Sequence, residues 1–200
     1  MANIYEPYQR TVDKFSKEGL IIRSAERSDL EGLINMKRNI IKELVPDLSK
    51  WYKNDEILAE EFYGPVDQDS EKRVYYVAED SKNKNLVGSI GLVQYNPLYN
   101  PSIGHLVNNY LTLENRGKGL GNIMLWDIIK KARKMKFSMI HLSTHPEFED
   151  AQALYRKYGF QIVKNVAKRR DKPVEYELVL SRREYTIMKK ILESRSYALR

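Results

Sequence analysis

A glycine-rich turn separates two strongly patterned segments in the middle of the chain. It reads Arg116-Gly117-Lys118-Gly119-Leu120-Gly121, and it follows a predicted strand over residues 103–113 and precedes a predicted helix. Glycines allow positive φ angles and close approach of a ligand to the backbone. The first N–H groups of a helix have no internal partner, and the helix dipole adds positive potential there. Together with the charges of Arg116 and Lys118, the turn predicts a site for phosphate or pyrophosphate.

Two familiar phosphate-binding motifs do not match this turn. A dinucleotide fingerprint needs a glycine where this chain has Asn122, and a P-loop needs serine or threonine directly after its lysine, where this chain has Gly119. Taken alone, the turn is equally well explained as a flexible start to a helix.

The order of apolar patterns predicts a mixed α/β layer in which antiparallel strands come first and crossovers later. Strands are predicted over residues 20–25, 73–79, 86–94, 103–113, 139–144, 160–163 and 174–180, and helices over 29–45, 49–64, 123–132, 149–158 and 182–200. Ser28 or Asp29 is the expected cap of the first helix. We expect an N-terminal extension over residues 1–19, one domain over 20–181 and a basic C-terminal helix or tail over 182–200.

Composition excludes several classes of protein. The 200 residues are enough for one domain with a proper core. No cysteine is present, which excludes a disulfide framework, a thiolate metal site and a cysteine nucleophile; with only three histidines, we expect no metal. No apolar run reaches the roughly 18 residues that a membrane helix needs, and the N-terminus lacks the pattern of a secretory signal. We therefore expect a cytoplasmic protein without a membrane partner.

Two motifs together resemble the signatures of the GNAT family of N-acetyltransferases. Arg116, Gly119 and Gly121 match the pattern [Q/R]-x-x-G-x-[G/A] of the family's coenzyme A pyrophosphate loop. About thirty residues later, residues 151–160 read A-Q-A-L-Y-R-K-Y-G-F, which is similar to the second signature, A-x-x-L-Y-x-x-x-G-F. The resemblance covers roughly residues 20–180. It implies a GNAT fold, α+β in class: a mixed, mostly antiparallel central sheet with a splayed pair of strands, flanked by helices and followed here by an extra C-terminal helix.

The resemblance implies a site for acetyl-coenzyme A, the donor of the acetyl group. In the family, the strand before the loop splays from its neighbour and bonds the pantetheine arm through its backbone; by position, those groups belong to Leu111, Thr112 and Leu113. Phe148 stands where relatives often have an asparagine that contacts coenzyme A, and we expect it to pack on the cofactor arm. The pyrophosphate is expected on the amides of Gly117, Lys118, Gly119, Leu120, Gly121 and Asn122, beside Arg116.

The resemblance also implies direct acyl transfer to an amine, without a covalent enzyme intermediate. Tyr155 has the position of the family's general acid, near the sulfur of coenzyme A. Histone-acetylating relatives use a strand glutamate as base about eleven residues before the loop, and His105 has that position here. The alternative interpretation, which the residue pattern favours, is that His105 is a polar histidine at the start of a strand; many relatives use ordered water as the base. Asn109 and Tyr110 are candidates for lining the acceptor channel.

The acceptor is expected to be a cationic primary amine, such as a polyamine, a lysine side chain or a peptide N-terminus. The locally acidic stretch over residues 55–71 falls near the expected entrance and would attract such an amine. Two other interpretations stay open. The net charge of +7 and the basic tail favour a nucleic-acid-binding module, although a tail that covers the domain or contacts a second copy in a homodimer explains the same residues. The other is a sensor that binds acetyl-coenzyme A without turnover, against which Tyr155 argues.

Overall fold

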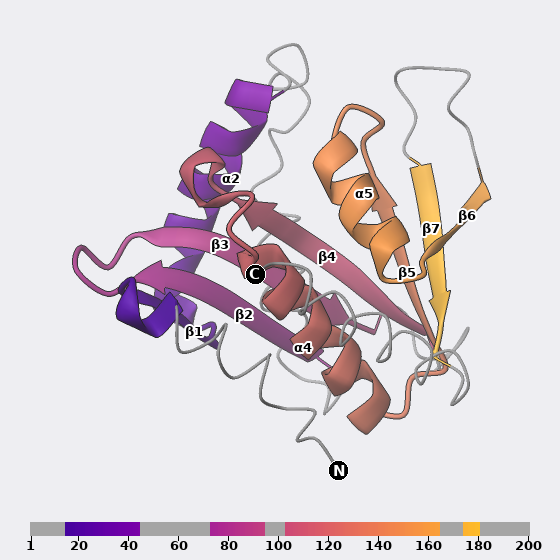
Figure 1. Ribbon diagram of the computed structural model, residues 1–200. Coiled ribbons are helices and arrows are strands. Elements are labelled where there is room, and N and C mark those ends of the chain that lie inside the picture. Colours follow the sequence, from indigo (N-terminus) through magenta and orange to yellow (C-terminus); the bar gives the residue numbers. More distant parts are fainter. Residues whose placement is uncertain (1–14, 45–72, 95–102, 165–173, 181–200) are drawn as a thin grey trace.

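The computed structural model describes residues 15–44, 73–94, 103–164 and 174–180. Within them, seven strands form one open sheet in the order β1-β2-β3-β4-β5-β7-β6 (Figure 1). β4 and β5 run parallel, and the other neighbouring pairs are antiparallel. The strands are β1 (Leu20–Ser24), β2 (Arg73–Asp80), β3 (Leu86–Val93), β4 (Ile103–Leu111), β5 (Met139–Thr144), β6 (Gln161–Lys164) and β7 (Val174–Val179). The helices are α2 (Leu30–Leu44), α4 (Leu120–Lys134) and α5 (Glu149–Lys157), with 3-10 turns η1 (Arg27–Asp29) and η3 (Leu113–Asn115).

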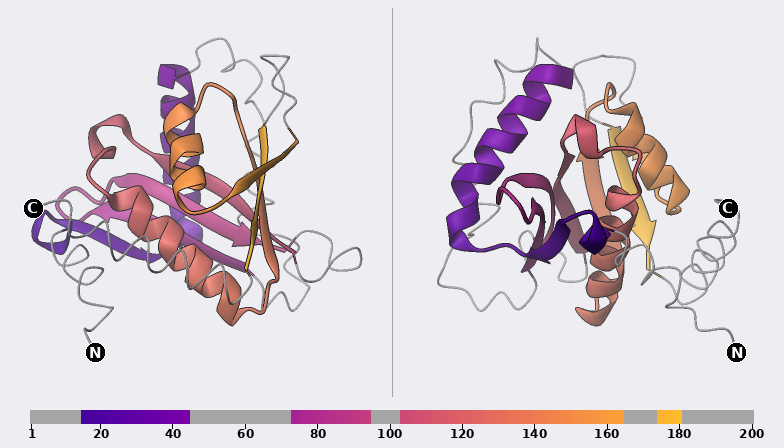
Figure 2. Two further views of the ribbon diagram at one scale, coloured as in Figure 1. Left: turned by 45° about the vertical axis from the view of Figure 1, so that its right-hand side comes forward. Right: turned by 60° about the vertical axis from the view of Figure 1, so that its left-hand side comes forward.

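Helices cover both faces of the sheet (Figure 2). α4 and α5 lie on one face, above the larger core, whose fully buried members include Ile90, Met124, Ile128 and Ile140. α2 lies on the opposite face and packs on a smaller core formed by Leu33, Met36, Ile40, Tyr75, Val77 and Val93. The sheet is therefore fixed between two apolar layers, and the turns at its ends are attached to rigid elements.

β4 and β5 separate after a short region of pairing. Their parallel register covers only residues 103–105 on β4, opposite 139–141 on β5. Beyond this region the two strands diverge (Figure 1). The β5-facing edge of β4 from Leu106 to Leu111 therefore has no strand partner among the residues that the structure describes. A mixed sheet with one splayed pair is the fold that the two motifs led us to expect.

A β-bulge bends β4 where its pairing with β5 has ended. Two residues of β4, Asn108 and Asn109, together oppose Ile90 of β3. Asn108 has a φ angle of 49°, a left-handed conformation that asparagine adopts more readily than most residues. Its carbonyl accepts a hydrogen bond from Ser89 Oγ at 2.7 Å, and its Nδ2 donates to the Tyr75 hydroxyl at 2.6 Å. These two bonds hold the bulge in place.

β4 is shorter than the sequence predicts. It ends at Leu111 rather than at residue 113, because residues 113–115 form η3, which leads into the glycine-rich turn. The Thr112 N–H makes one last bond to the Val87 carbonyl at 3.0 Å before the chain turns. Apolar character alone continues through Leu113, so the pattern did not reveal this boundary.

The start of α2 also differs from the expected one. Neither Ser28 nor Asp29 caps this helix directly, because η1 precedes it. Instead, the Asp29 side chain accepts a bond from the N–H of Glu26 at 2.7 Å, which closes η1. Phe15 is 1% exposed and belongs to the larger core, so packing begins before residue 20. The helices predicted over residues 49–64 and 182–200 lie outside the described residues.

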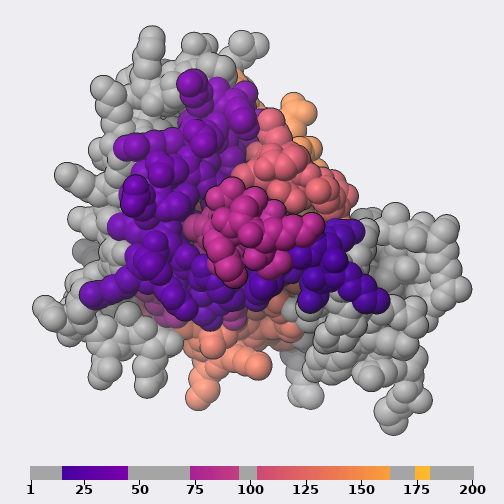
Figure 3. Space-filling model, turned by 90° about the vertical axis from the view of Figure 1, so that its left-hand side faces the viewer, coloured from indigo at the N-terminus to yellow at the C-terminus, as the bar shows by residue number. Residues whose placement is uncertain are grey.

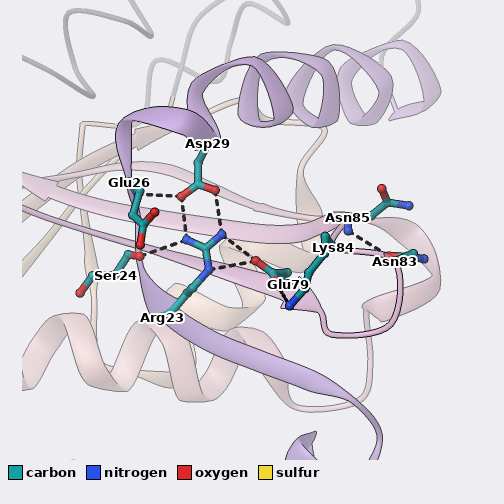
Figure 4. A network of polar contacts seen from close by, with 8 residues as sticks. All are labelled: Arg23, Ser24, Glu26, Asp29, Glu79, Asn83, Lys84 and Asn85. Carbon is teal, nitrogen blue, oxygen red and sulfur yellow. Dashed lines mark hydrogen bonds and ion pairs between the residues drawn. The ribbon is translucent and has the colours of Figure 1, made fainter.

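Arg23 joins β1, β2 and the start of α2 through two carboxylates (Figure 4). Its Nη1 and Nη2 bond the two oxygens of Asp29, both at 2.8 Å, and its Nη2 and Nε bond Glu79 Oε2 at 2.6 and 2.9 Å. Lys84 Nζ lies 3.1 Å from Glu79 Oε1. Asp29 and Glu79 are 7% and 6% exposed. Hydrogen bonding to Arg23 is the main reason that the pKa of each carboxyl is lowered.

Replacing Arg23 by methionine should destabilise the fold, since it leaves two buried carboxylates without their main counter-ion. We expect the free energy of unfolding at pH 7 to fall by about 3 kcal/mol. Both carboxyls have a lowered pKa in the folded state, so their contribution is present above their ordinary pKa values and is lost as the pH falls below about 4. Urea denaturation of the wild type and the variant at pH 7 and at about pH 3.5 measures both effects.

Lys82→Met is a matched control, because Lys82 is an exposed cation on the turn between β2 and β3. It should change the free energy of unfolding by no more than about 0.5 kcal/mol. An Arg23→Met protein as stable as the wild type at pH 7, or one whose deficit does not shrink at low pH, would contradict this role of the network.

Candidate functional site

One cavity, of about 520 Å³, lies where the end of β4 meets the glycine-rich turn and the N-terminal end of α5. Ile40 and Leu44 of α2 close another side of it. The predicted site residues that line this cavity are Leu111, Arg116, Gly117, Gly119, Leu120, Gly121, Asn122 and Phe148. The predicted site residues outside its lining are His105, Thr112, Leu113, Lys118 and Tyr155.

The glycine-rich turn presents a run of free backbone N–H groups at the start of α4. Gly117 and Gly119 have φ angles of 70° and 99°, in the left-handed region that favours glycine. Gly119 is the N-cap of α4. Within the described part of the chain, the N–H groups from Gly117 to Gly121 have no acceptor. Because the positive end of the α4 dipole lies at the same place, the turn is suited to bind a phosphate or pyrophosphate.

Asn122 marks the end of this run. Its N–H donates to the Gly119 carbonyl at 3.1 Å, inside the first turn of α4. Its side-chain oxygen accepts a hydrogen bond from Lys157 Nζ, and its carbonyl accepts one from the Tyr158 hydroxyl at 2.8 Å. Asn122 therefore fastens α4 to α5, and the free run is one residue shorter than the predicted one.

The two cations of the turn have different surroundings. Arg116 Nε and Nη2 both donate to the Leu111 carbonyl at 3.0 Å, so this side chain ties the turn to the end of β4. Lys118 Nζ donates to Asn115 Oδ1 at 3.4 Å and lines a neighbouring hollow between α2 and the β2–β3 turn. Figure 3 shows that face, with the β2–β3 turn (magenta) against α2 (purple). The structure therefore does not direct Lys118 into the cavity.

The part of β4 that lines the cavity is displaced from the predicted segment. Asn109, Tyr110 and Leu111 line it. Thr112 does not, because its N–H is bonded within the sheet, and Leu113 is 47% exposed in η3. The Leu111 carbonyl is already occupied by Arg116. The physical reason for the displacement is that β4 ends two residues earlier than its apolar pattern suggests.

Tyr155 is buried on α5, with 3% of its surface exposed. Its hydroxyl accepts a hydrogen bond from Asn109 Nδ2 at 3.0 Å. Its ring centroid lies 5.6 Å from that of Phe160 and 6.0 Å from that of Tyr176. Burial raises the pKa of Tyr155 to about 12, against the opposing effect of the Asn109 bond. The hydroxyl is therefore protonated at neutral pH, as a general acid must be.

His105 lies at the other end of β4 from the cavity. It precedes Asn109 by four residues, which is about 13 Å along an extended strand. Its ring approaches His141 on β5 edge-on, with the ring centroids 5.2 Å apart. Burial, with a smaller contribution from His141, lowers the pKa of His105 to about 4. The structure does not bring His105 together with Tyr155.

Phe148 holds the N-cap position of α5 and lines the cavity. Its N–H donates to the His145 carbonyl at 3.0 Å, and its carbonyl accepts from the Gln152 N–H at 3.0 Å. The rings of His145 and Phe148 have centroids 5.8 Å apart. The cavity therefore has an aromatic surface at this position, where an asparagine would offer an amide.

Three acidic residues beside the cavity were not marked by the sequence patterns: Glu147, Glu149 and Asp150. Acidic residues in the first turn of a helix are common because they complement the helix dipole. Their pattern therefore indicated the start of a helix rather than a site.

Among the described residues, no three histidine, aspartate or glutamate side chains are grouped as metal ligands would be. The same part of the chain contains no helix with the length and apolar character needed to cross a membrane.

Comparison with known protein families gives a match over residues 39–160, to a family described as the acetyltransferase (GNAT) family. The matched region includes both the glycine-rich turn and the second motif on α5. No curated protein sequence matches the chain.

Several solved structures share this arrangement of elements. An acetyltransferase of the GNAT family from Staphylococcus aureus Mu50 is 21% identical and superposes with a TM-score of 0.63, over 81% of this chain and 99% of that one. The PaiA N-acetyltransferase from Thermoplasma acidophilum, in complex with coenzyme A, is 21% identical, with a TM-score of 0.62 over 80% and 98% of the two chains. The spermidine N-acetyltransferase from Vibrio cholerae, in complex with coenzyme A and spermine, is 20% identical, with a TM-score of 0.59 over 82% and 96%. At these identities the similarity shows a shared fold.

Proposed function

Because the chain belongs to the acetyltransferase (GNAT) family, a family of N-acetyltransferases, we propose that it transfers the acetyl group of acetyl-coenzyme A to a primary amine, which attacks the thioester directly in a ternary complex. One observation carries this proposal. A single cavity combines the edge of β4 that has lost its pairing with β5 and the start of α4, where the N–H groups of four lining residues, Gly117, Gly119, Leu120 and Gly121, have no acceptor among the described residues. Such a cavity suits a long ligand with amide groups and a pyrophosphate, and coenzyme A has both.

The pyrophosphate would bind at the glycine-rich turn. The free N–H groups of residues 117–121 supply hydrogen bonds to its oxygens, and the α4 dipole adds a favourable potential. Arg116 contributes its charge from the cavity lining while it holds the turn against β4. Lys118 adds positive potential from the neighbouring hollow rather than a direct contact.

The pantetheine arm would lie along the open edge of β4, in the place of a further strand. Its amides are the right groups to bond the β5-facing edge of β4 between Leu106 and Leu111, where the pairing with β5 has ended. On the other side of the cavity, Phe148, Ala151 and Leu154 of α5 offer apolar contacts for its methylene groups. The strand contact thus falls mainly before Leu111 rather than on residues 111–113.

The chemistry of the transfer needs an acid for the departing sulfur and a donor for the carbonyl oxygen. Tyr155 is proposed as the acid, since it is protonated at neutral pH and its hydroxyl is bonded to Asn109, which lines the cavity. A backbone N–H on the open edge of β4 would stabilise the negative charge that develops on the carbonyl oxygen.

The amine must lose a proton before or during its attack. We propose that water carries this proton out of the cavity, with His105 as the alternative base. His105 is outside the cavity lining, so it would act through intervening water. With a pKa of about 4 it is neutral at pH 7. If His105 is the base, kcat/KM should fall on the acid side of about pH 4, and this acid limb should disappear in His105→Gln.

A cationic amine is the proposed acceptor class. Glu147, Glu149 and Asp150 give the cavity wall on α5 a negative charge. The acidic stretch over residues 55–71, which suggested the same class, lies outside the described residues. The similar V. cholerae enzyme was solved with spermine, which adds support for a polyamine.

Release of free coenzyme A is the direct test. The chain has no cysteine, so the protein itself adds no thiol to the assay and the signal comes from the coenzyme A that is released. We expect thiol release that depends on a primary amine, with an acetylated product of matching yield in the mass spectrum. Spermidine, a peptide with a free lysine and a peptide with only a free N-terminus would rank the acceptors.

Fully N-methylated spermidine is the matched control, because it keeps the shape and cannot form a stable amide. Binding of acetyl-coenzyme A without thiol release for any primary amine would support the sensor instead. Absence of binding would overturn the proposal and favour the nucleic-acid module.

A further inference from the structure

A side-chain hydrogen bond connects the two sides of the gap between β4 and β5. Asn109, on the open edge of β4, donates from Nδ2 to the hydroxyl oxygen of Tyr155 on α5 at 3.0 Å. α5 follows β5 in the chain, so it belongs to the side of the sheet that diverges from β4 (Figure 1). The bond therefore fixes the hydroxyl relative to the β4 backbone, in the region where strand pairing has ended.

This bond has a direction. The Tyr155 oxygen is the acceptor, and its own hydrogen has no acceptor among the described residues. The neighbouring Tyr176 hydroxyl is already engaged: it donates to Gln152 Oε1 at 3.0 Å and accepts from Arg156 Nη1 at 3.3 Å. Since Tyr155 is 3% exposed, bulk water has little access to it. The hydrogen of Tyr155 is thus not committed to another side chain among the described residues.

The β4 bulge determines where Asn109 points. Asn108 reaches Tyr75 in the core beneath α2, whereas Asn109 reaches Tyr155 in the core beneath α4 and α5. The side chains of these neighbouring bulge residues therefore point to opposite faces of the sheet. Because Asn108 is held by both Tyr75 and Ser89, the direction of Asn109 is fixed by the fold.

We propose that Asn109 is a positioning residue for the general acid: its amide holds the Tyr155 hydroxyl so that the O–H hydrogen is given to the departing sulfur. This inference rests on the acetyl transfer proposed above. In that step the amine nitrogen bonds to the acyl carbon, the carbon–sulfur bond breaks, and the sulfur keeps its electron pair and takes the Tyr155 proton. The proton lost from the amine nitrogen returns to the phenolate through solvent. Meanwhile Asn109 donates to the phenolate and stabilises it.

Asn109→Asp tests this orientation, because it keeps the shape of the side chain and removes its donor. An ionised carboxylate only accepts hydrogen bonds, so the Tyr155 hydrogen would be directed to it and withheld from the sulfur. We expect kcat to fall about 100-fold, to the level of Tyr155→Phe. The double variant should then be no slower than Tyr155→Phe alone. Losses that multiply in the double variant would overturn the proposal.

The pH dependence separates orientation from packing. When the introduced carboxyl is protonated it becomes a donor again, so the ratio of kcat in Asn109→Asp to kcat in the wild type should rise as the pH falls. Dividing by the wild-type kcat removes the effect of protonating the amine acceptor. Among the described residues, the other titratable or charged side chains at this position are Tyr176 and Arg156. A ratio that is constant with pH would assign Asn109 a packing role only and reject the proposal.

A measurement without turnover tests the same bond. In protein labelled with 3-fluorotyrosine, fluorine NMR follows the titration of Tyr155, whose resonance is assigned by its loss in Tyr155→Phe. Donation from Asn109 lowers the pKa of Tyr155, so Asn109→Leu should raise it. An unchanged pKa would count against the proposal. Asn85→Asp, on the exposed turn between β2 and β3, should leave both kcat and this titration unchanged.

These results distinguish the two levels of the argument. If the wild type releases no coenzyme A with any amine, the proposed function fails, and the fluorine titration still decides whether Asn109 acts on Tyr155. If the wild type is active and Tyr155→Phe is slow while Asn109→Asp is as fast as the wild type, the function stands and the role of Asn109 is wrong.

Discussion

Gly119→Glu should weaken the binding of acetyl-coenzyme A roughly 100-fold, whereas Gly119→Gln should weaken it less. Gly119 lies at the centre of the five free N–H groups and lines the cavity. A carboxylate at this place competes for the N–H groups and repels the pyrophosphate. If it displaces two charge-assisted hydrogen bonds, the loss is about 3 kcal/mol, or roughly a 100-fold increase in Kd. Isothermal titration with acetyl-coenzyme A gives Kd for each protein.

The glutamine variant isolates the charge. Both variants place a side chain of the same length at a φ angle of 99°, so both carry the same backbone strain, about 1–2 kcal/mol. A Cβ at Gly119 would meet no heavy atom within 4 Å, so neither variant creates a clash through its Cβ. Equal Kd values for the two variants would show that the turn's conformation, rather than its N–H groups, governs binding. Wild-type affinity in Gly119→Glu would remove the pyrophosphate from this turn.

Tyr155→Phe should lower kcat about 100-fold or more while leaving the Kd of acetyl-coenzyme A unchanged, since general acid catalysis contributes on the order of 10²–10⁴ in rate. The hydroxyl is the only group removed, and the ring keeps its contacts with Phe160 and Tyr176. With a pKa of about 12, Tyr155 stays protonated up to high pH. Wild-type kcat should therefore show no basic limb from this residue between about pH 7 and 10.

Tyr158→Phe is the matched control, because Tyr158 lies about one helical turn after Tyr155, at the C-cap of α5. It removes a buried hydroxyl that donates to the Asn122 carbonyl at 2.8 Å. It should lower stability and leave kcat within about threefold, because it does not touch the reacting atoms. Steady-state kinetics of both variants with the best amine decide the matter. A Tyr155→Phe enzyme with wild-type kcat would mean that the sulfur departs without this acid.

The glycine-rich turn shows what local sequence can specify. Positive φ at Gly117 and Gly119, and the start of a helix directly after them, follow from residue chemistry and were predicted correctly. The end of β4 was not, because Leu113 continues the apolar pattern while η3 turns the chain away. A short 3-10 turn leaves no periodic signal.

Sequence patterns did not predict the hydrogen bonds between residues that are far apart in the chain. Asn109 and Tyr155 are separated by 46 residues, and their contact depends on a bulge at Asn108 that itself depends on Tyr75 and Ser89. Asp29 was assigned to a helix cap from its local position, but its strongest partner is Arg23 on a neighbouring strand. Such contacts depend on the register in which the strands pair. The sequence of a single segment does not determine that register.

If the pantetheine arm binds along β4 as proposed, the incomplete pairing of β4 with β5 means that stability and activity compete for the same hydrogen bonds. A regular sheet would pair the β5-facing edge of residues 106–111 with β5, and this fold forgoes the stabilisation of that pairing. A ligand that occupies the gap completes the sheet and shifts the folding equilibrium in proportion to its concentration. Substitutions that closed the two strands onto each other would produce a more stable protein and remove the proposed place of the pantetheine arm. Selection for thermal stability alone would therefore work against catalysis at this position.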